Sequence, residues 1–276
     1  MSLSVDTMRT IDHRVGVPLC ALATPFVMLF DWIKTFIAGP STTPRKLLFV
    51  ELSEMGSAIL VDPAMRDAQA RGAEIFFLIF KSNKASLTLL NTVPAANIFT
   101  IDASSLVSLV VDTIKFLFQA RARKIDTVID LELFSRFTAL LTGLCGARRR
   151  VGYHIFHGEG LWRGNMLTHK VHYNPHIHIA KNFMALIHAA FSTKAEQPFS
   201  KVHITDASIQ IAQAVINPND KHAVLERIER LAREARLTFT LGQQPLLLVN
   251  PNASELLVQR RWAPESFSAL IIALQK

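Results

Sequence analysis

Cysteine is scarce in this 276-residue chain, and its two copies lie far apart. Cys20 and Cys145 have neither the spacing of metal ligands nor that of a redox pair. The sequence therefore predicts no disulfide framework, and a reducing compartment is favoured. Short-period repeats and low-complexity tracts are also missing, so the chain is not a repeat protein.

Acidic residues are outnumbered by basic ones. Asp and Glu total 22 against 30 Lys and Arg, which gives a formal net charge of +8 and an isoelectric point near 9.8. This excess favours acidic partners: phosphorylated ligands, anionic lipid surfaces or nucleic acid. Half of the residues are hydrophobic and the mean hydropathy is +0.25, which is high for a soluble protein but below a multi-span membrane protein. The length suits one large or two modest domains.

The longest uncharged run near the N-terminus is too short for a membrane span. Val15–Phe30 carries no charge but contains Pro18 and Pro25, whereas a spanning helix needs about 20 apolar residues. No A-x-A-like signal-peptide cleavage site follows the run. Three alternatives stay open: an interfacial membrane anchor with Trp32 and Lys34 at headgroup level, a helix packed on the domain, or a span.

Strands and helices alternate after Pro44. Strands are expected at Leu47–Glu51, Glu74–Phe80, Asn97–Ile101, Thr127–Leu131, Arg150–Tyr153 and His169–Tyr173. Helices are expected at Ala58–Arg71, Lys84–Asn91, Ser105–Arg123, Ser135–Cys145, Ile177–Phe191, Thr205–Val215 and Asp220–Ala235. This order predicts an α/β fold with a doubly wound, Rossmann-like parallel sheet.

Two segments share one layout of apolar run, polar or glycine-containing turn and amphipathic helix. They are Lys46–Met65 and Pro245–Lys276. Each predicts a strand followed by a helix whose free N–H groups suit an anionic or phosphorylated ligand. Because only about 26 residues follow Asn250, the second domain is expected to be only begun. The expected divisions are an N-terminal segment and linker at 1–44, a first domain with a helical extension at 45–240, and the start of a second domain at 241–276.

Four motifs follow one another in an order and spacing that is specific as a set. They are LSEMGSAILVDPAM, DTVIDLELFSRFTALL, GARRRVGY, and NPNAS with RRWAPESF. From about Lys46 onward the chain resembles glycosyltransferase family 9, the heptosyltransferase-like enzymes of lipopolysaccharide and surface-glycan assembly. The resemblance implies a GT-B architecture in which the first domain binds the acceptor and the second mainly the sugar nucleotide. It also implies inverting transfer without a metal ion or other cofactor, and no D-x-D sequence occurs here.

The chain departs from the family pattern at two places. Sugar-transferring members have an aspartate, proposed as the base, directly after the glycine of the first turn, whereas here Ser57 follows Gly56. A serine hydroxyl does not act as a general base near neutral pH without a helper. The family's late donor-site motif would lie beyond Lys276, so we expect a C-terminally truncated chain with little or no transfer activity.

The candidate catalytic residues lie in this first turn. Glu54 could reach an acceptor hydroxyl as a base, so Glu54 and Ser57 are the candidate catalytic pair. Gly56 would allow an acceptor to approach the backbone closely. The alternative is that Glu54 only complements the helix dipole. Asp62 lies on another part of the helix and is expected to be a surface charge.

Further candidates are expected on both sides of a substrate cleft. Arg136 follows the carboxyl end of a strand and could pair with an acceptor phosphate or carboxylate, or be an ordinary surface arginine. His157, in the HGEG loop, could line the acceptor cleft or belong to a structural loop. The resemblance implies a donor-binding role for Asn252, Ser254 and Arg260, with Arg260 stabilising the diphosphate leaving group.

The other polar clusters predict no additional ligand. Six histidines lie between His154 and His178, but only His172 and His176 have a suitable helical spacing, and Pro175 breaks that helix. No metal site is therefore expected. The Arg148–Arg150 run lacks interleaved aromatic residues, so it predicts a solvated charge cluster and no nucleic-acid site.

The leading functional interpretation is transfer of a sugar from an ADP-heptose-like nucleotide sugar to a lipopolysaccharide or other surface-glycan acceptor. The expected partners are this donor, a lipid-linked glycan acceptor and the inner-leaflet membrane surface. The expected location is cytoplasmic and peripheral to the inner membrane, which suits the basic charge. The alternative is a non-catalytic acceptor-domain remnant or glycan-binding module.

Overall fold

The computed structural model describes residues 5–39, 43–155, 161–192, 203–214, 216–238, 240, 243, 246–251 and 261–274. The chain forms two compact units, Met1–Val215 and Ile216–Lys276. The first unit contains the sheet and the cluster of acidic residues that makes up the candidate site.

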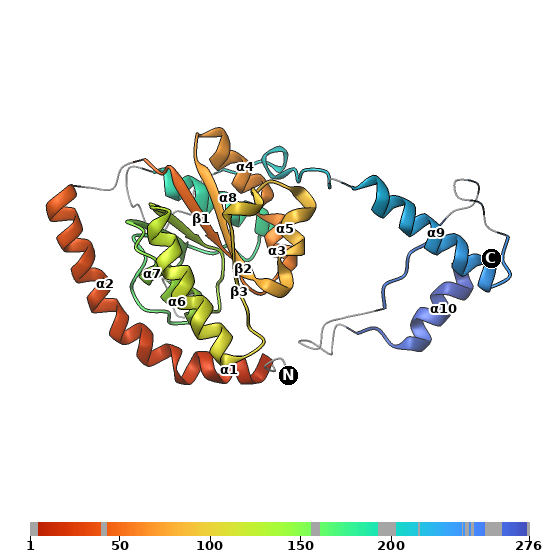
Figure 1. The fold of residues 1–276 in the computed structure, drawn as a ribbon, viewed down its shortest axis with the longest axis horizontal. Helices are drawn as coiled ribbons and strands as arrows, with labels where there is room; N and C mark the ends of the chain where they lie inside the picture. The colour runs from red at the N-terminus through yellow and green to blue at the C-terminus, as the bar shows by residue number, and fades with distance from the viewer. Residues whose placement is uncertain are drawn as a thin grey trace. The chain divides into compact units, whose positions relative to one another are not determined.

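A six-stranded parallel sheet in the order β3-β2-β1-β4-β5-β6 forms the centre of the first unit (Figure 1). Its strands are β1 Lys46–Val50, β2 Glu74–Phe80, β3 Ile98–Ile101, β4 Thr127–Asp130, β5 Arg149–Tyr153 and β6 His169–Val171. The chain moves outward from β1 to β3 and then returns to place β4 on the other side of β1. This reversal creates a topological switch point between β1 and β4. The predicted α/β class with a doubly wound parallel sheet is confirmed.

Both faces of the sheet are buried, which explains the continuous apolar strands. Leu47 and Phe49 lie in the core on one face, and Leu48 and Val50 in the core on the other, as the alternation of strand side chains requires. The first face is covered by α3 Met55–Leu60, α4 Asp62–Ala70, α5 Ala85–Leu90 and α8 Ile179–Phe191. The second is covered by α6 Leu106–Ala122 and α7 Arg136–Leu144. Short 3-10 turns lie at Lys81–Asn83, Ala95–Asn97 and Asp206–Ile209.

Two helices precede the sheet: α1 Val5–Arg14 and α2 Gly16–Ala38. Helix α2 packs mainly against α7, and its Asp31 also bonds to Arg150 of β5. Its Cys20 and Val27 form a small third core with Ala139 of α7 and Met166. One stripe of the helix is therefore packed on the domain, and its interfacial placement, which depends on the outer surface, stays a prediction.

Helix α2 is longer than the sequence predicted. It has 23 residues and includes Pro25. Pro18 falls in the first turn, where a missing N–H breaks no intrahelical bond. The helix continues past Asp31 and Lys34, because both side chains face the protein and bond to it. Among the described residues, α2 is the single helix that is long and apolar enough to cross a membrane by length and composition.

The helix predicted at Thr205–Val215 is wrong, because only Asp206–Ile209 form a short 3-10 turn within the described part of this segment. After this turn, backbone groups of the segment bond to side chains of α4. The Ala212 N–H donates to Asp62 Oδ2 at 3.0 Å, and the Gln210 carbonyl accepts from Arg66. Asp62 is consequently fully buried and is not the surface charge that the sequence predicted. The predicted helix Ala58–Arg71 is likewise two helices, α3 and α4, which meet at Val61 just before Pro63.

The second unit contains two described helices, α9 Pro218–Glu234 and α10 Pro264–Leu274. Trp262 packs edge to face on Phe267 at the start of α10, with ring centroids 5.0 Å apart. The strand predicted at Leu246–Val249 is wrong, because residues 246–251 form no strand. A strand needs a hydrogen-bonding neighbour, and the described part of this unit contains none.

Candidate active site

Four acidic residues converge at the switch point. Glu51 directly follows β1, Asp130 ends β4, Glu132 lies two residues further, and Glu54 precedes α3. The parallel register puts Val50 of β1 beside Asp130 of β4, so the carboxyl ends of the two strands meet. Open α/β sheets bind ligands at this place.

Hydrogen bonds from the loop after β1 hold the acidic side chains together. Ser53 Oγ and the Leu52 N–H donate to Glu132 Oε1, at 3.1 and 3.3 Å. The Glu54 N–H donates to Glu51 Oε1 at 3.1 Å. The loop thus wraps around one carboxyl group from each strand, which fixes the geometry of the site.

Glu51 is the buried member of this cluster, with 3% of its surface exposed. Burial, the negative charge of Glu132 and a hydrogen bond to the Glu132 side chain together raise the pKa of Glu51 to about 10. Glu51 therefore keeps its proton near neutral pH and donates it in a hydrogen bond to Glu132. The sequence analysis missed Glu51, although its signal was a charged residue directly after an apolar strand.

Glu54 is the exposed member, and Ser57 orients it. The buried Ser57 Oγ donates to Glu54 Oε2 at 2.8 Å. Apart from its two chain neighbours and the backbone of its own helix, no described atom lies within 4 Å of the position that a Cβ of Gly56 would occupy, so the space beside this turn is open. The structure brings the predicted residues Glu54, Gly56 and Ser57 together, and their roles stay predictions.

Asn83, which the sequence analysis also missed, supports the same loop from β2. Its Nδ2 donates to the carbonyls of Leu52 and Ser53, at 3.1 and 3.0 Å. The Leu52 carbonyl also accepts from the Phe80 N–H of β2 at 3.2 Å, so both backbone and side-chain bonds hold this loop to β2 and the turn that follows it. The sequence offered no signal for Asn83, because its role depends on the pairing of β1 with β2.

A buried ion pair lies beside the acidic cluster. Arg163 Nη1 is 3.0 Å from Oδ2 of the fully buried Asp130, and Arg163 Nη2 donates to the Tyr153 carbonyl at 2.9 Å. Burial raises the pKa of Asp130 to about 6, and the charge of Arg163 opposes that rise. Arg163 lies in an irregular segment, so the sequence gave no reason to pair it with Asp130.

A cavity of about 510 Å³ borders this ion pair. It lies among residues from β4, β5 and β6 and the segment 161–167, including Trp162, Arg163 and Lys170. Burial, with the nearby charges of Lys170 and Arg163, lowers the pKa of His154 in the cavity wall. The lining combines apolar and aromatic side chains with Lys170 and the Asp130–Arg163 pair, so it suits a ligand that has both apolar surface and polar or anionic groups.

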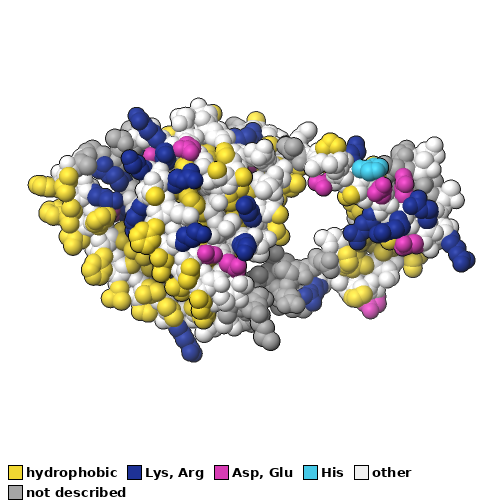
Figure 2. All heavy atoms as spheres, in the orientation of Figure 1, with side chains coloured by type: hydrophobic (Ala, Val, Ile, Leu, Met, Phe, Trp, Pro, Cys, Tyr) yellow, Lys and Arg dark blue, Asp and Glu magenta, His cyan; other side chains and the backbone are white. Residues whose placement is uncertain are grey.

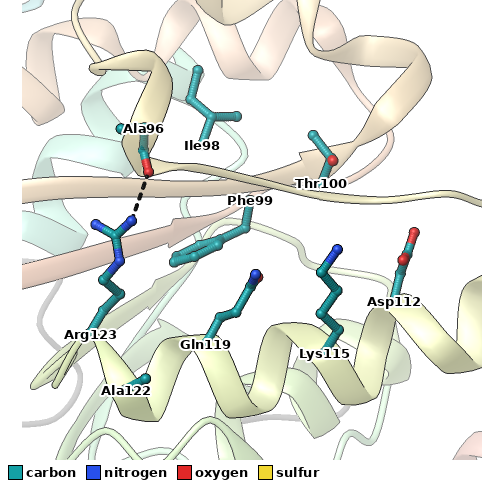
Figure 3. Close-up of a pocket in the computed structure, with 9 residues that line it drawn as sticks. All are labelled: Ala96, Ile98, Phe99, Thr100, Asp112, Lys115, Gln119, Ala122 and Arg123. Atoms are coloured by element: carbon teal, nitrogen blue, oxygen red, sulfur yellow. Dashed lines mark hydrogen bonds between the residues drawn. The ribbon is translucent and has the colours of Figure 1, made fainter.

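A smaller hollow of about 270 Å³ lies between β3 and α6 (Figure 3). Lys115, Gln119 and Arg123 extend from α6 toward β3, and Arg123 donates to the Ala96 carbonyl at 3.4 Å. Because β3 is an edge strand, this hollow lies away from the switch point and from the acidic cluster.

Arg136 is not open to solvent. It is buried, its Nη1 lies 3.2 Å from Asp12 Oδ2 of α1, and its Nε donates to the Trp162 carbonyl at 2.9 Å. Its guanidinium therefore holds α1 and the segment around Trp162 against α7. Acceptor binding by Arg136 stays a prediction, and it would require this pairing to open.

The solvated cluster predicted for Arg148–Arg150 is wrong. Arg149 and Arg150 are buried, and each arginine binds a different part of the chain. Arg148 donates to Gly39, Arg149 to the carbonyls of Ala190 and Ser192 after α8, and Arg150 to Asp31 of α2. The reason is that this run enters β5, an interior strand, where charged side chains must find partners.

Several predicted residues lie outside the described part of the chain: His157, Asn252, Ser254 and Arg260. Their roles in acceptor and donor binding stay predictions. In the described part, no group of three or more His, Cys, Asp or Glu side chains is arranged to hold a metal ion.

No family model and no curated protein matches the sequence. Solved structures do resemble the fold. A glycosyltransferase family 9 protein from Veillonella parvula DSM 2008 aligns with a TM-score of 0.58 at 15% identity, over 85% of this chain and 60% of that protein. The E. coli heptosyltransferase WaaC aligns less well. Its complex with ADP gives a TM-score of 0.44 at 17% identity, over 55% of this chain and 49% of that protein. Its complex with ADP-2-deoxy-2-fluoro heptose gives 0.47 at 16% identity, over 68% and 73%.

The likeness to the Veillonella protein shows a shared α/β fold. This chain spans about 60% of that protein's length.

Proposed function

We propose that this chain is a glycosyltransferase of the heptosyltransferase type. It would move a sugar from a nucleotide sugar, such as ADP-heptose, to a hydroxyl of a lipid-linked surface glycan. The observation that carries the proposal is the acidic cluster at the switch point, in a fold shared with a family 9 glycosyltransferase. That position is where an α/β sheet of this kind binds its substrate.

The chemistry requires one carboxylate that can take a proton from the acceptor hydroxyl. In the proposed step Glu54 accepts that proton, the acceptor oxygen bonds to the anomeric carbon, and the sugar–phosphate bond breaks. The electron pair leaves with the nucleoside diphosphate, and the configuration at the anomeric carbon inverts. Ser57 holds the Glu54 carboxylate in place through its hydrogen bond of 2.8 Å. No metal ion is needed in this scheme, since Arg260 would stabilise the leaving diphosphate.

The cavity beside Asp130 and Arg163 is the proposed acceptor site; Glu54 is not part of its lining, so the acceptor would have to extend beyond the cavity for its hydroxyl to reach Glu54. The cavity volume of about 510 Å³ would hold one or two sugar rings or a phosphorylated sugar. Lys170 supplies a positive charge for an acceptor phosphate or carboxylate. The donor would bind through Asn252, Ser254 and Arg260.

The proposal is tested by measuring the nucleotide that the protein releases from a panel of nucleotide sugars. The panel includes ADP-heptose, and a glycolipid acceptor is present. In contrast to the little or no activity expected from the sequence, the proposal predicts release above background, and Glu54→Gln should lower kcat by about 10²- to 10⁴-fold with little change in KM. Glu74→Gln is the matched control, because Glu74 is also exposed but lies at the opposite end of β2. Full activity of the Glu54→Gln enzyme would remove Glu54 from the mechanism.

A second candidate is a glycan-binding module without catalysis. It is favoured by the identity of Ser57, a residue that cannot itself replace the family's aspartate base. This candidate predicts saturable binding of the acceptor glycan without nucleotide release from any sugar donor in the panel. That pair of results would contradict the transferase proposal.

A further inference from the structure

One stripe of α2 faces the protein, and most of its remaining surface is apolar and exposed. The inward positions recur at helical spacing: Gly16, Cys20, Val27, Asp31 and Lys34. Large side chains cover the outer surface, with Phe26 69%, Trp32 67% and Phe36 82% exposed. A helix that is apolar around its circumference is normally buried in a core or placed in lipid. The outer surface of α2 is neither in a core nor against another described helix.

The charged residues of α2 are all turned inward. Asp31 Oδ1 accepts from Arg150 Nη1 at 3.0 Å, and Lys34 Nζ donates to the Gly146 carbonyl at 2.9 Å. On α1, Asp12 pairs with Arg136. These bonds attach α1 and α2 to the body at several points along their length. Lipid cannot surround a helix that is held in this way, so α2 cannot cross a bilayer while it stays docked.

Helix α6 adds a second apolar region on the same side of the sheet. Both α2 and α6 contact α7, which lies between them. The exposed apolar side chains of α6 are Leu106, Val107, Val110, Val111, Ile114 and Phe118. Figure 2 shows hydrophobic side chains gathered over α2 at the left and over α6 at the lower centre. An exposed apolar surface of this extent marks an interaction site.

The charge around this surface selects its partner. The one acidic residue of α6, Asp112, accepts from the Asp102 N–H at 2.9 Å, and Asp31 of α2 is paired with Arg150. The exposed cations near the surface are Arg14, Lys115 and Arg121. An apolar surface edged by cations and without an outward carboxylate on α2 or α6 complements an anionic bilayer. Two copies of this cation-edged surface would carry charge of the same sign, whereas an anionic bilayer supplies the opposite charge, which favours the bilayer as the occupant.

We propose that the outer surface of α2 and the exposed side of α6 form a docking surface for an anionic lipid bilayer. Helix α2 lies in the interface plane, with Phe26 and Phe36 inserted and Trp32 at headgroup level. The docking does not depend on sugar transfer, so it is tested without any sugar substrate.

Flotation of the full chain with vesicles measures this docking. Binding is expected to phosphatidylcholine vesicles that contain phosphatidylglycerol, and to be at least tenfold weaker without the anionic lipid. The double variant Phe26→Glu/Phe36→Glu should bind at least tenfold less, while Leu89→Glu should bind as the unchanged chain does. Leu89 is the matched control because it is exposed and apolar but lies on α5, across the sheet. Unchanged circular dichroism and continued protection of Cys20 from alkylation show that α2 is still docked in the variants.

Trp32 reports the depth of insertion. In a Trp162→Phe/Trp262→Phe background, its emission should shift to the blue on binding, and lipids brominated near the headgroup should quench it best. Best quenching by bromines at the bilayer centre, with resistance to alkaline carbonate extraction, would show a spanning helix and overturn the proposal. Binding that is absent, or that the Phe26→Glu/Phe36→Glu variant retains, overturns it as well. A dimer in solution that this variant dissociates would show that a second copy covers the surface.

Discussion

Replacing Glu51 by glutamine should stabilise the first unit, by an amount that grows with pH. Burial and the neighbouring Glu132 raise the pKa of Glu51 from 4.5 to about 10. Between these values the folded chain holds a proton that the unfolded chain has released, so stability falls as pH rises toward 10. The stability that the Glu51 proton contributes is fully present below pH 4.5 and is lost progressively between pH 4.5 and about pH 10. Glutamine has the shape of protonated glutamate and can donate to Glu132, but it has no proton to lose.

The size of the effect follows from the position of neutral pH between the two pKa values. Keeping Glu51 protonated at pH 7 costs about 3 kcal/mol, because each pH unit above the unfolded value is worth about 1.4 kcal/mol. Glu51→Gln should therefore raise the free energy of unfolding by under about 1 kcal/mol at pH 5 and by about 3 kcal/mol at pH 7. The gain should keep growing up to pH 9.

Urea unfolding followed by tryptophan fluorescence at pH 5, 7 and 9 measures this gain. Glu54→Gln, in the same loop but exposed, is the matched control, and its effect should stay below about 1 kcal/mol throughout. A gain from Glu51→Gln that is equal at the three pH values would show that Glu51 is not the group that titrates. A loss of stability at pH 7 and 9 would show that the folded chain holds Glu51 ionised.

Two other changes probe the buried charges and the docking of α2. Arg163→Met should lower the free energy of unfolding by about 3 kcal/mol at pH 8, because Asp130 is then a buried charge without its partner. The loss should be smaller at pH 5, which is below the Asp130 pKa of about 6. Urea unfolding at the two pH values measures both losses. An equal loss at both pH values would contradict this. Cys20, whose pKa burial raises to about 11, should react with iodoacetamide at pH 8 about 100-fold more slowly than a free thiol. Asp31→Asn should speed the alkylation of Cys20, because it loosens the attachment of α2. Mass spectrometry of the labelled peptide measures the rate, and an unchanged rate would contradict this prediction.

The strands of the sheet could be predicted because their apolar runs are continuous and turn residues bound them. Glu74–Phe80 matches β2 at both ends, and the other strands differ by one or two residues. Pairing in the sheet then places the ends of β1 and β4 together, which is why the sequence could place candidate residues at Glu54 and just after the strand end that precedes Arg136.

The wrong predictions share a physical cause: in each case a side chain or a backbone group bonds to a segment that is distant in the sequence. The Thr205–Val215 pattern has helical spacing, but its backbone groups bond to Asp62 and Arg66 of α4 instead. Arg150 was expected in solvent because its partner Asp31 lies 119 residues away in sequence. Local pattern carries no information about such partners, so charged residues next to buried strands are the least predictable from sequence.

The identity of the proposed base follows from which carboxylate is both ionised and accessible. Glu51 holds its proton up to about pH 10, and Asp130 is fully buried against Arg163, so neither can accept a proton from a bound hydroxyl at neutral pH. Glu132 Oε1 is already bound to Ser53 and to the Leu52 N–H, which makes it part of the loop framework. Glu54 is exposed beside the open space at Gly56. The proton on Glu51 also matters here, because it removes one negative charge from the cluster beside Glu54 and the bound acceptor.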